Sequence, residues 1–262
     1  MLKRRIIPKL QMRASRFAKK PRMVLVTTRG FGETVEIGDP VSQARIYEAQ
    51  AADELVFLDL DASADNRSTV IDVVRRAAEE IFMPFTVGGG VRTVEDFRVL
   101  LANGADKVSV NTAALERPEL ITEASAAFGA QCVVLSVDYR RDPDGADRVY
   151  ARGGAQATGL DPAQWAARGE ALGAGEILLT CIDRDGSREG LDLEGCRRVA
   201  AAVSVPVIVS GGCGAAAHFV EGFARGGADA VAAGTYFSFK NENILQIRSR
   251  IVNAGIPVRQ TR

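Results

Sequence analysis

The sequence has almost no histidine and no excess of charge of either sign. Its 262 residues contain one histidine, His218, and 33 acidic side chains balance 33 basic ones. A lone histidine in an expected helix is more typical of a packed or solvated residue than of a metal ligand, so no metal site is expected. Without a net positive field to attract a polyanion, nucleic acid is not an expected partner.

Long apolar runs and paired cysteines are also missing. No run reaches the ~18 apolar residues that a membrane-spanning helix needs, and residues 1–8 turn into a strand pattern too quickly for a signal peptide. The four cysteines lack the spacing of a disulfide framework or a zinc site: Cys132, Cys181, Cys196 and Cys213. These absences favour a cytoplasmic protein with reduced thiols and no membrane contact. The 47% apolar content is ample for a globular core.

What the sequence does have is an internal repeat. Glycine-rich turns occur at residues 88–90 and 211–214, and Gly90 precedes Gly212 by 122 positions. A second matched block follows each turn, residues 104–112 and 227–235, at an offset of 123. This long period indicates two copies of one supersecondary unit. Glycines let backbone N–H groups approach an anion, so each copy predicts a phosphate cradle, with a tight structural turn as the alternative.

Short β-branched runs alternate with Ala/Arg/Glu-rich stretches, which predicts βα units around a parallel sheet. Eight strands are expected near residues 4–11, 55–60, 84–88, 106–110, 132–138, 176–182, 206–210 and 229–233, with seven helical segments between them and a closing helix at 243–254. The length fits the about 250 residues of a (β/α)₈ barrel. No linker divides the chain. Residues 1–262 are therefore expected to form one (β/α)₈ TIM barrel with a two-fold half-barrel repeat.

Chemistry in such a barrel lies at the carboxyl ends of the strands. The polar residues expected there are Gln11, Asp59, Asp61, Asn111, Thr112, Asp138, Asp183, Asp185 and Thr235. An ionised Asp138 at the barrel mouth lowers stability unless it has a function or a partner, so it is a catalytic candidate. The alternative is an ion pair with Arg140 or Arg141. Asp59 and Asp183 are open between structural and functional roles, and Asp185 between a turn and a substrate hydroxyl. The longest irregular stretch, 13–38, is expected to be a lid or mobile loop, with a possible hairpin strand at 23–28.

Several long motifs resemble the cyclase subunit of imidazole glycerol phosphate synthase. They lie at residues 5–8 (RIIP), 53–59 (DELVFLD), 86–90 (TVGGG), 107–114 (KVSVNTAA), 173–180 (GAGEILLT) and 183–187 (DRDGS), and the resemblance runs over 1–259. It implies a barrel that joins ammonia, made by a separate glutaminase subunit, to a substrate with two phosphates. The products are imidazole glycerol phosphate and an aminoimidazole carboxamide ribotide. A heterodimer without a cofactor is expected.

The resemblance also assigns roles to residues. It gives one phosphate site Gly90, Asn111 and Thr112, and it gives the other site and its neighbouring substrate contacts Asp185, Gly186, Gly212, Cys213, Gly234 and Thr235. Asp138 matches one of two catalytic aspartates. At the other, the family has Cys-Leu-Asp where this chain has Lys9-Leu10-Gln11. An amide cannot transfer a proton as a carboxyl can, and such steps contribute about 10² to 10⁴ in rate.

The resemblance also implies a catalytic lysine in the first loop and a charged ammonia gate. Lys19 aligns with the catalytic lysine without a gap, but an insertion before residue 22 would place Leu25 there instead. The gate residues match Arg5, Glu54, Lys107 and Glu176, at the amino ends of strands one, two, four and six. Two cations and two anions fit a salt-bridged ring, and four ordinary surface charges are the alternative.

Three functions stay open. The first is a cyclase-type, ammonia-using synthase subunit, with Gln11 favouring a divergent paralogue that works with a glutaminase and an amidotransferase on amidino-modified surface sugars. The second is a non-catalytic scaffold that activates the glutaminase. The third is the related phosphoribosyl-formimino isomerase, which should also have an acid at position 11 and has no need of a gate.

Overall fold

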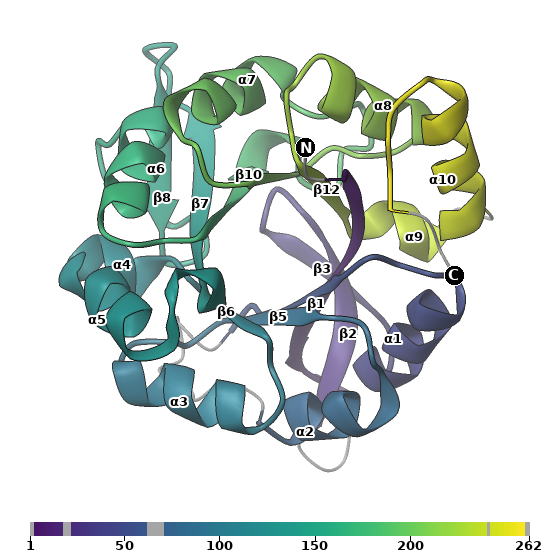
Figure 1. Cartoon of the computed structure of the whole chain (residues 1–262), viewed down its shortest axis with the longest axis horizontal. Coiled ribbons are helices and arrows are strands. Elements are labelled where there is room, and N and C mark those ends of the chain that lie inside the picture. The colour runs from purple at the N-terminus through teal and green to yellow at the C-terminus, as the bar shows by residue number, and fades with distance from the viewer. Residues whose placement is uncertain (1–2, 18–21, 62–70, 240–241, 260–262) are drawn as a thin grey trace.

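The computed structural model describes residues 3–17, 22–61, 71–239 and 242–259. Within these residues, eight parallel strands close into a barrel in the order β10-β11-β12-β1-β4-β5-β6-β7, and β7 pairs back with β10 (Figure 1). The barrel strands are β1 (Arg5–Ala14), β4 (Leu55–Asp59), β5 (Phe85–Gly88), β6 (Lys107–Val110), β7 (Val133–Arg141), β10 (Glu176–Cys181), β11 (Val207–Ser210) and β12 (Ala230–Ala233). The predicted (β/α)₈ fold is confirmed.

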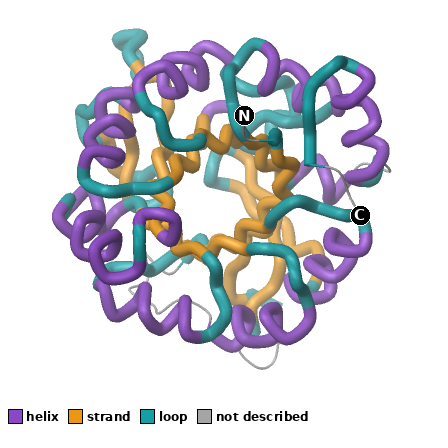
Figure 2. Tube along the Cα trace, viewed as in Figure 1, coloured by secondary structure: helices purple, strands orange, loops and turns teal. Residues whose placement is uncertain are grey.

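Helices surround the barrel on the outside (Figure 2). They are α1 (Pro40–Ala49), α2 (Ile71–Glu80), α3 (Val94–Ala102), α4 (Thr112–Glu116), α5 (Glu119–Phe128), α6 (Pro162–Ala171), α7 (Leu193–Ala202), α8 (Ala216–Ala224), α9 (Thr235–Phe239) and α10 (Ile244–Asn253). Single 3₁₀ turns lie at Ala130–Cys132 and Ile182–Arg184. Side-chain caps fix several helix starts; Thr93 and Asp96 form a capping box at α3, and Asn243 and Gln246 form another at α10. The closing helix lies where the sequence predicts it.

The strands are buried on both faces, which explains their continuous apolar runs. Side chains alternate across each strand. Ile7, Val56, Val134, Leu178 and Ile208 belong to a small apolar cluster separate from the main core. Ile7 and Leu178 lie two positions after Arg5 and Glu176, on the face of each strand that lines the inside of the barrel. The larger cluster, which includes Leu135 and Ile177, fills the space between sheet and helices.

Two antiparallel hairpins extend the barrel at the carboxyl ends of its strands. The first, β2 (Met23–Arg29) and β3 (Glu33–Gly38), pairs with the end of β1, and the second, β8 (Asp147–Ala151) and β9 (Gln156–Ala157), pairs with the end of β7. The expectation that 13–38 is mainly irregular was therefore wrong, although the possible strand at 23–28 is confirmed. Left-handed backbone at Gly30 and Phe31 makes the tight turn between β2 and β3.

The two hairpins occupy matching places, because β1 and β7 are the first strands of the two four-stranded halves. No helix in the described part of the chain has the length and apolar character needed to cross a membrane.

Candidate functional site

Four charged side chains form a closed ring at the amino ends of the strands, which we call the charged ring. Arg5 bonds Glu54 at 2.8 Å and Glu176 at 2.5 Å, and Lys107 Nζ lies 2.9 Å from Glu54 and 2.7 Å from Glu176. The side chains of Glu54 and Glu176 are 4% and 6% exposed. Burial lowers the pKa of Arg5, but the two carboxylates outweigh it and the net shift is upward. The structure thus brings together all four predicted gate residues.

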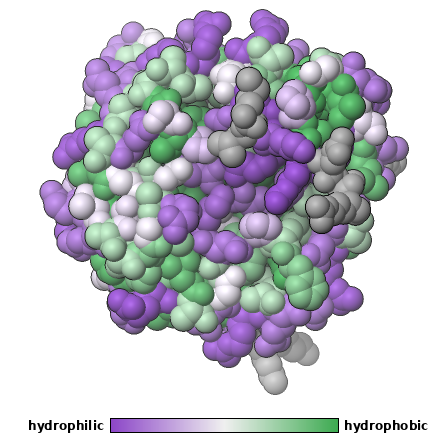
Figure 3. Space-filling view, in the orientation of Figure 1, coloured by the Kyte–Doolittle hydropathy of each residue, from purple (hydrophilic) through white to green (hydrophobic). Residues whose placement is uncertain are grey.

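The charged ring borders a depression of about 470 Å³ on the outside of the barrel. Figure 3 shows the face on which the N-terminus lies, and hydrophilic residues gather at its centre. On the inner side of the charged ring comes the apolar layer that includes Ile7, Val134 and Leu178. Buried hydroxyls from four strands follow further along the same inward positions: Ser109, Ser136, Thr180 and Ser210. The barrel interior therefore changes from charged to apolar to polar along its axis.

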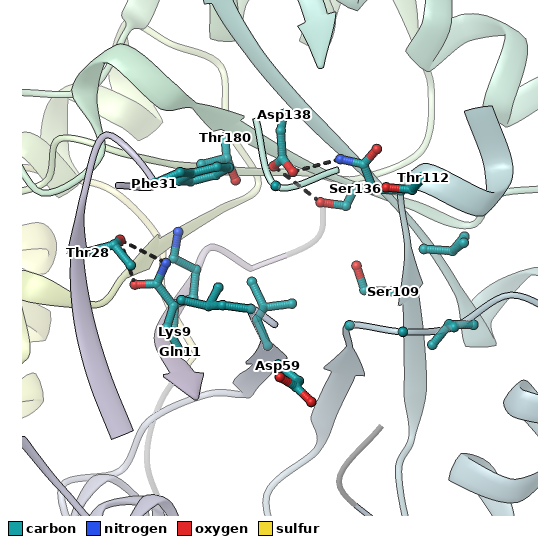
Figure 4. Close-up of a pocket in the computed structure, with 18 residues that line it drawn as sticks. Lys9, Gln11, Thr28, Phe31, Asp59, Ser109, Thr112, Ser136, Asp138 and Thr180 are labelled. Atoms are coloured by element: carbon teal, nitrogen blue, oxygen red, sulfur yellow. Dashed lines mark hydrogen bonds between the residues drawn. The ribbon is translucent and has the colours of Figure 1, made fainter. Parts of the chain in front are cut away.

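At the opposite end the strands surround a cavity of about 130 Å³ (Figure 4). Its lining contains Gln11, Asp138 and the first predicted phosphate set of Gly90, Asn111 and Thr112. Beside it lies a space of about 10 Å³, room for roughly one water. This smaller space is lined by the second predicted set, which comprises Asp185, Gly186, Gly212, Cys213, Gly234 and Thr235. The structure therefore brings the second predicted set together beside the larger cavity.

Asp138 lies half-buried on β7 and faces the larger cavity. Asn111 Nδ2 donates to its Oδ2 at 2.7 Å. Burial raises its pKa to about 6, against the lowering effects of the Lys9 charge and of hydrogen bonds from Asn111 and Thr180. A carboxyl that titrates near neutrality suits acid–base work.

The alternative for Asp138, an ion pair with a neighbouring arginine, does not occur. Arg140 pairs with Asp183 at 3.9 Å, and Arg141 pairs with Asp147 at 3.1 Å. Asp183 also accepts from the Arg141 N–H, so its contacts are those of a residue that fixes the β7 extension. Asp59, by contrast, is buried and lines the cavity.

Gln11 is buried beside β2 and belongs to a short hydrogen-bonded chain. Its Nε2 donates to Thr28 Oγ1 at 3.0 Å, and the Thr28 hydroxyl donates to Asp185. Since one hydroxyl carries one proton, Thr28 accepts from Gln11 while it donates to Asp185. Asp185 is therefore buried and contacts side chains at the site.

Lys9 is a site residue that the sequence reasoning missed. It is 4% exposed, lines both spaces together with Gln11, and its Nζ lies 3.8 Å from Asp185 Oδ1. The signal was available, because strand alternation puts residues 5, 7, 9 and 11 of β1 on one face. With Arg5 and Gln11 assigned to the barrel interior, Lys9 had to point there too.

Close backbone packing requires glycine in both glycine-rich turns. Gly89 has φ +100°, and a Cβ there would lie 2.2 Å from the Asp59 carbonyl oxygen; Gly212 has φ +97°, and its Cβ would lie 2.1 Å from the Gly190 oxygen. Both positions need glycine whether or not an anion binds. The Asn111 amide is committed to Asp138 and the Tyr150 carbonyl. A phosphate at this site would therefore be bound mainly by other groups.

The structure also locates most of the other residues that the sequence analysis named. Lys19 lies outside the described residues, and Leu25 is buried in β2 as part of the core. Cys213 is buried, and burial raises the pKa of its thiol. His218 lies on α8, where its Nδ1 accepts from the Gly214 N–H at 3.0 Å, so the packed interpretation is confirmed. Among the described residues, no cluster of His, Cys, Asp or Glu side chains has the grouping of a metal site.

The chain also matches a known protein family. A family model described as "Histidine biosynthesis protein" matches residues 5–243. The matched range contains all eight barrel strands, the charged ring and both spaces at the carboxyl ends of the strands. Because the match covers far more than half of the chain, this protein belongs to the histidine biosynthesis protein family.

Proposed function

We propose that the chain is the cyclase-type subunit of a glutamine-dependent synthase of the imidazole glycerol phosphate synthase kind. It would use ammonia from a glutaminase subunit on a substrate that carries two phosphates. The observation that carries this proposal is the charged ring at one end of the barrel, on the same axis as the polar cavity at the other end. The proposal places the heterodimer in the cytoplasm, where its four free cysteines stay reduced.

The layers along the barrel support passage of neutral ammonia rather than ammonium. A glutaminase bound over the depression of about 470 Å³ would release ammonia against the charged ring. Opening one ion pair admits a small molecule, and the apolar layer that includes Ile7 and Leu178 disfavours an ion because of its desolvation cost. The hydroxyls beyond this layer then offer hydrogen-bond partners near the reaction site.

The cavity supports acid–base chemistry with one carboxyl in place of two. Asp138 has a pKa of about 6 and is poised to accept or donate a proton. Gln11 cannot do so, and the step it would have assisted loses about 10² to 10⁴ in rate. We expect slow turnover with free ammonia for this reason. Gln11→Asp is expected to raise the rate.

The test supplies the purified chain with the two-phosphate substrate, first with ammonium salt and then with glutamine plus a glutaminase from the same source. Product that appears in both arms and is lost in Asp138→Asn supports the proposal. Failure of the glutaminase to bind, or no product in either arm, would overturn it.

A second candidate rests on the replacement of the family's Cys-Leu-Asp by Lys9-Leu10-Gln11. Under it the chain stimulates a glutaminase and passes ammonia on, for example to an amidotransferase acting on surface sugars, or serves only as an activating scaffold. Faster glutamine hydrolysis without product from the two-phosphate substrate would favour this candidate. An isomerase role is disfavoured by Gln11, because that reaction also needs an acid at this position.

A further inference from the structure

Lys9 is a buried cation whose contacts do not explain why it is there. Its Nζ carries three donors, but among the described residues the structure records no hydrogen bond from it, and its one ion pair, to Asp185, is 3.8 Å long. A lysine at 4% exposure with such a long contact is costly for stability. The cost points to a task at the site, and the donors are available for a ligand.

Its position decides which part of a ligand it can reach. Lys9 and Gln11 are shared by the lining of both spaces at the carboxyl ends of the strands. A ligand with one phosphate among Gly90 and Thr112 and the other among Gly212 and Thr235 must therefore cross over Lys9. Figure 4 shows Lys9 and Asp138 reaching into the cavity from different strands.

We propose that Lys9 is a substrate-binding residue that donates a hydrogen bond from its ammonium to an oxygen in the segment between the two phosphates, and that it is the electrostatic partner of Asp138. This rests on the proposed two-phosphate function and specifies it, because the middle of the substrate must carry an electronegative oxygen. Gln11, whose Nε2 already donates to Thr28, is less available for this contact.

The charges around the site are arranged to orient Lys9. Asp185, which follows β10, accepts from Thr28 of β2 and lies on one side of the Lys9 ammonium. The Lys9 charge lowers the pKa of Asp138 on β7, and the Asp185 charge raises that pKa. The other carboxylate that lines the cavity is Asp59 of β4. Removal of the Lys9 charge therefore takes away a cation that lowers the pKa of Asp138 and leaves the raising effect of Asp185 in place.

The test compares Lys9→Met, which removes the charge at similar length, with Lys9→Arg, which keeps it. Arg197→Met is the matched control, since Arg197 is an exposed cation on the outer face of α7. Calorimetry measures binding of two probes, fructose 1,6-bisphosphate and hexane-1,6-diol bisphosphate. The second probe has two phosphates but no oxygen between its phosphoester groups.

We expect the wild type to prefer the fructose compound and Lys9→Met to lose about tenfold or more of that preference, the size of a charged hydrogen bond. The ionisation midpoint of Asp138, followed by carboxyl NMR, should rise in Lys9→Met and stay in Lys9→Arg. Folding of each variant is checked by circular dichroism, and Arg197→Met should match the wild type in both readouts.

Two results separate the possible failures. If a folded Lys9→Met keeps the wild-type preference and the wild-type midpoint of Asp138, the inference about Lys9 is overturned while the two-phosphate site stands. If the wild type binds neither bisphosphate, the proposed function fails and this inference fails with it.

Discussion

Lys107→Met should strongly destabilise the protein, because it breaks a ring whose carboxylates have little access to water. Lys107 Nζ contacts both Glu54 and Glu176, which are 4% and 6% exposed. After the change Arg5 alone faces two carboxylates. Removal of one member of a buried ion pair typically costs 3–5 kcal/mol, and the 20% exposure of Lys107 argues for the lower end, about 3 kcal/mol.

Thermal and urea unfolding measure this change directly. For a domain of this size, a loss of about 3 kcal/mol lowers the melting temperature by roughly 6–12 °C. Arg197→Met, which removes an exposed ion pair with Glu194 on α7, should leave the melting temperature nearly unchanged. A double-mutant cycle with Glu176→Gln should show coupling between the two sites. A loss below about 1 kcal/mol for Lys107→Met would show that water reaches the carboxylates and would refute the reasoning.

Three further predictions follow from the site. Because the pKa of Asp138 is raised from 3.8 to about 6, the folded state holds this proton more tightly than the unfolded state, so its contribution to stability is present below pH 4 and lost as the pH rises through 6. Asp138→Asn should thus gain stability relative to the wild type between pH 4 and pH 8, by at most about 3 kcal/mol, and an equal difference at both pH values would contradict this. Gly89→Ala, whose Cβ would meet the Asp59 oxygen, should lower the free energy of unfolding in urea by about 2 kcal/mol or more. A change of less than about 0.5 kcal/mol, as for an ordinary surface substitution, would contradict this prediction. Glu176→Lys should uncouple glutamate release from product formation in the complex with glutaminase while bisphosphate binding persists; unchanged coupling would count against ammonia passage through the charged ring.

The barrel could be predicted because its strands are short apolar runs with strong boundaries. The β7 run at Val133–Val137 is buried throughout, and no helical pattern competes with it. The second hairpin was harder to predict because β8 alternates in burial and carries polar residues. In β8 (Asp147–Ala151), Asp147, Val149 and Ala151 are buried while Arg148 and Tyr150 are partly exposed, and the preceding aspartates and glycine indicate a loop.

The site was predictable where residue type and strand position agreed, as for Asp138. Lys9 was harder to predict because lysine is rarely buried, although strand alternation puts it on the same face of β1 as Gln11. The close packing of Gly186 and Gly212 against the neighbouring backbone could not be predicted, since it depends on how the loops of distant strands meet.

The charged ring is complete only when both halves of the chain are present. Arg5, Glu54 and Lys107 lie in the first half of the chain, with Glu54 just before β4, whereas Glu176 begins β10 in the second half, 171 residues after Arg5. Until that carboxylate has emerged from the ribosome, the ring residues present are two cations and one anion. An isolated first half would keep this imbalance within the ring. Charge neutrality at the axis is thus a property of the whole barrel, and it disfavours any early closed state built from one half.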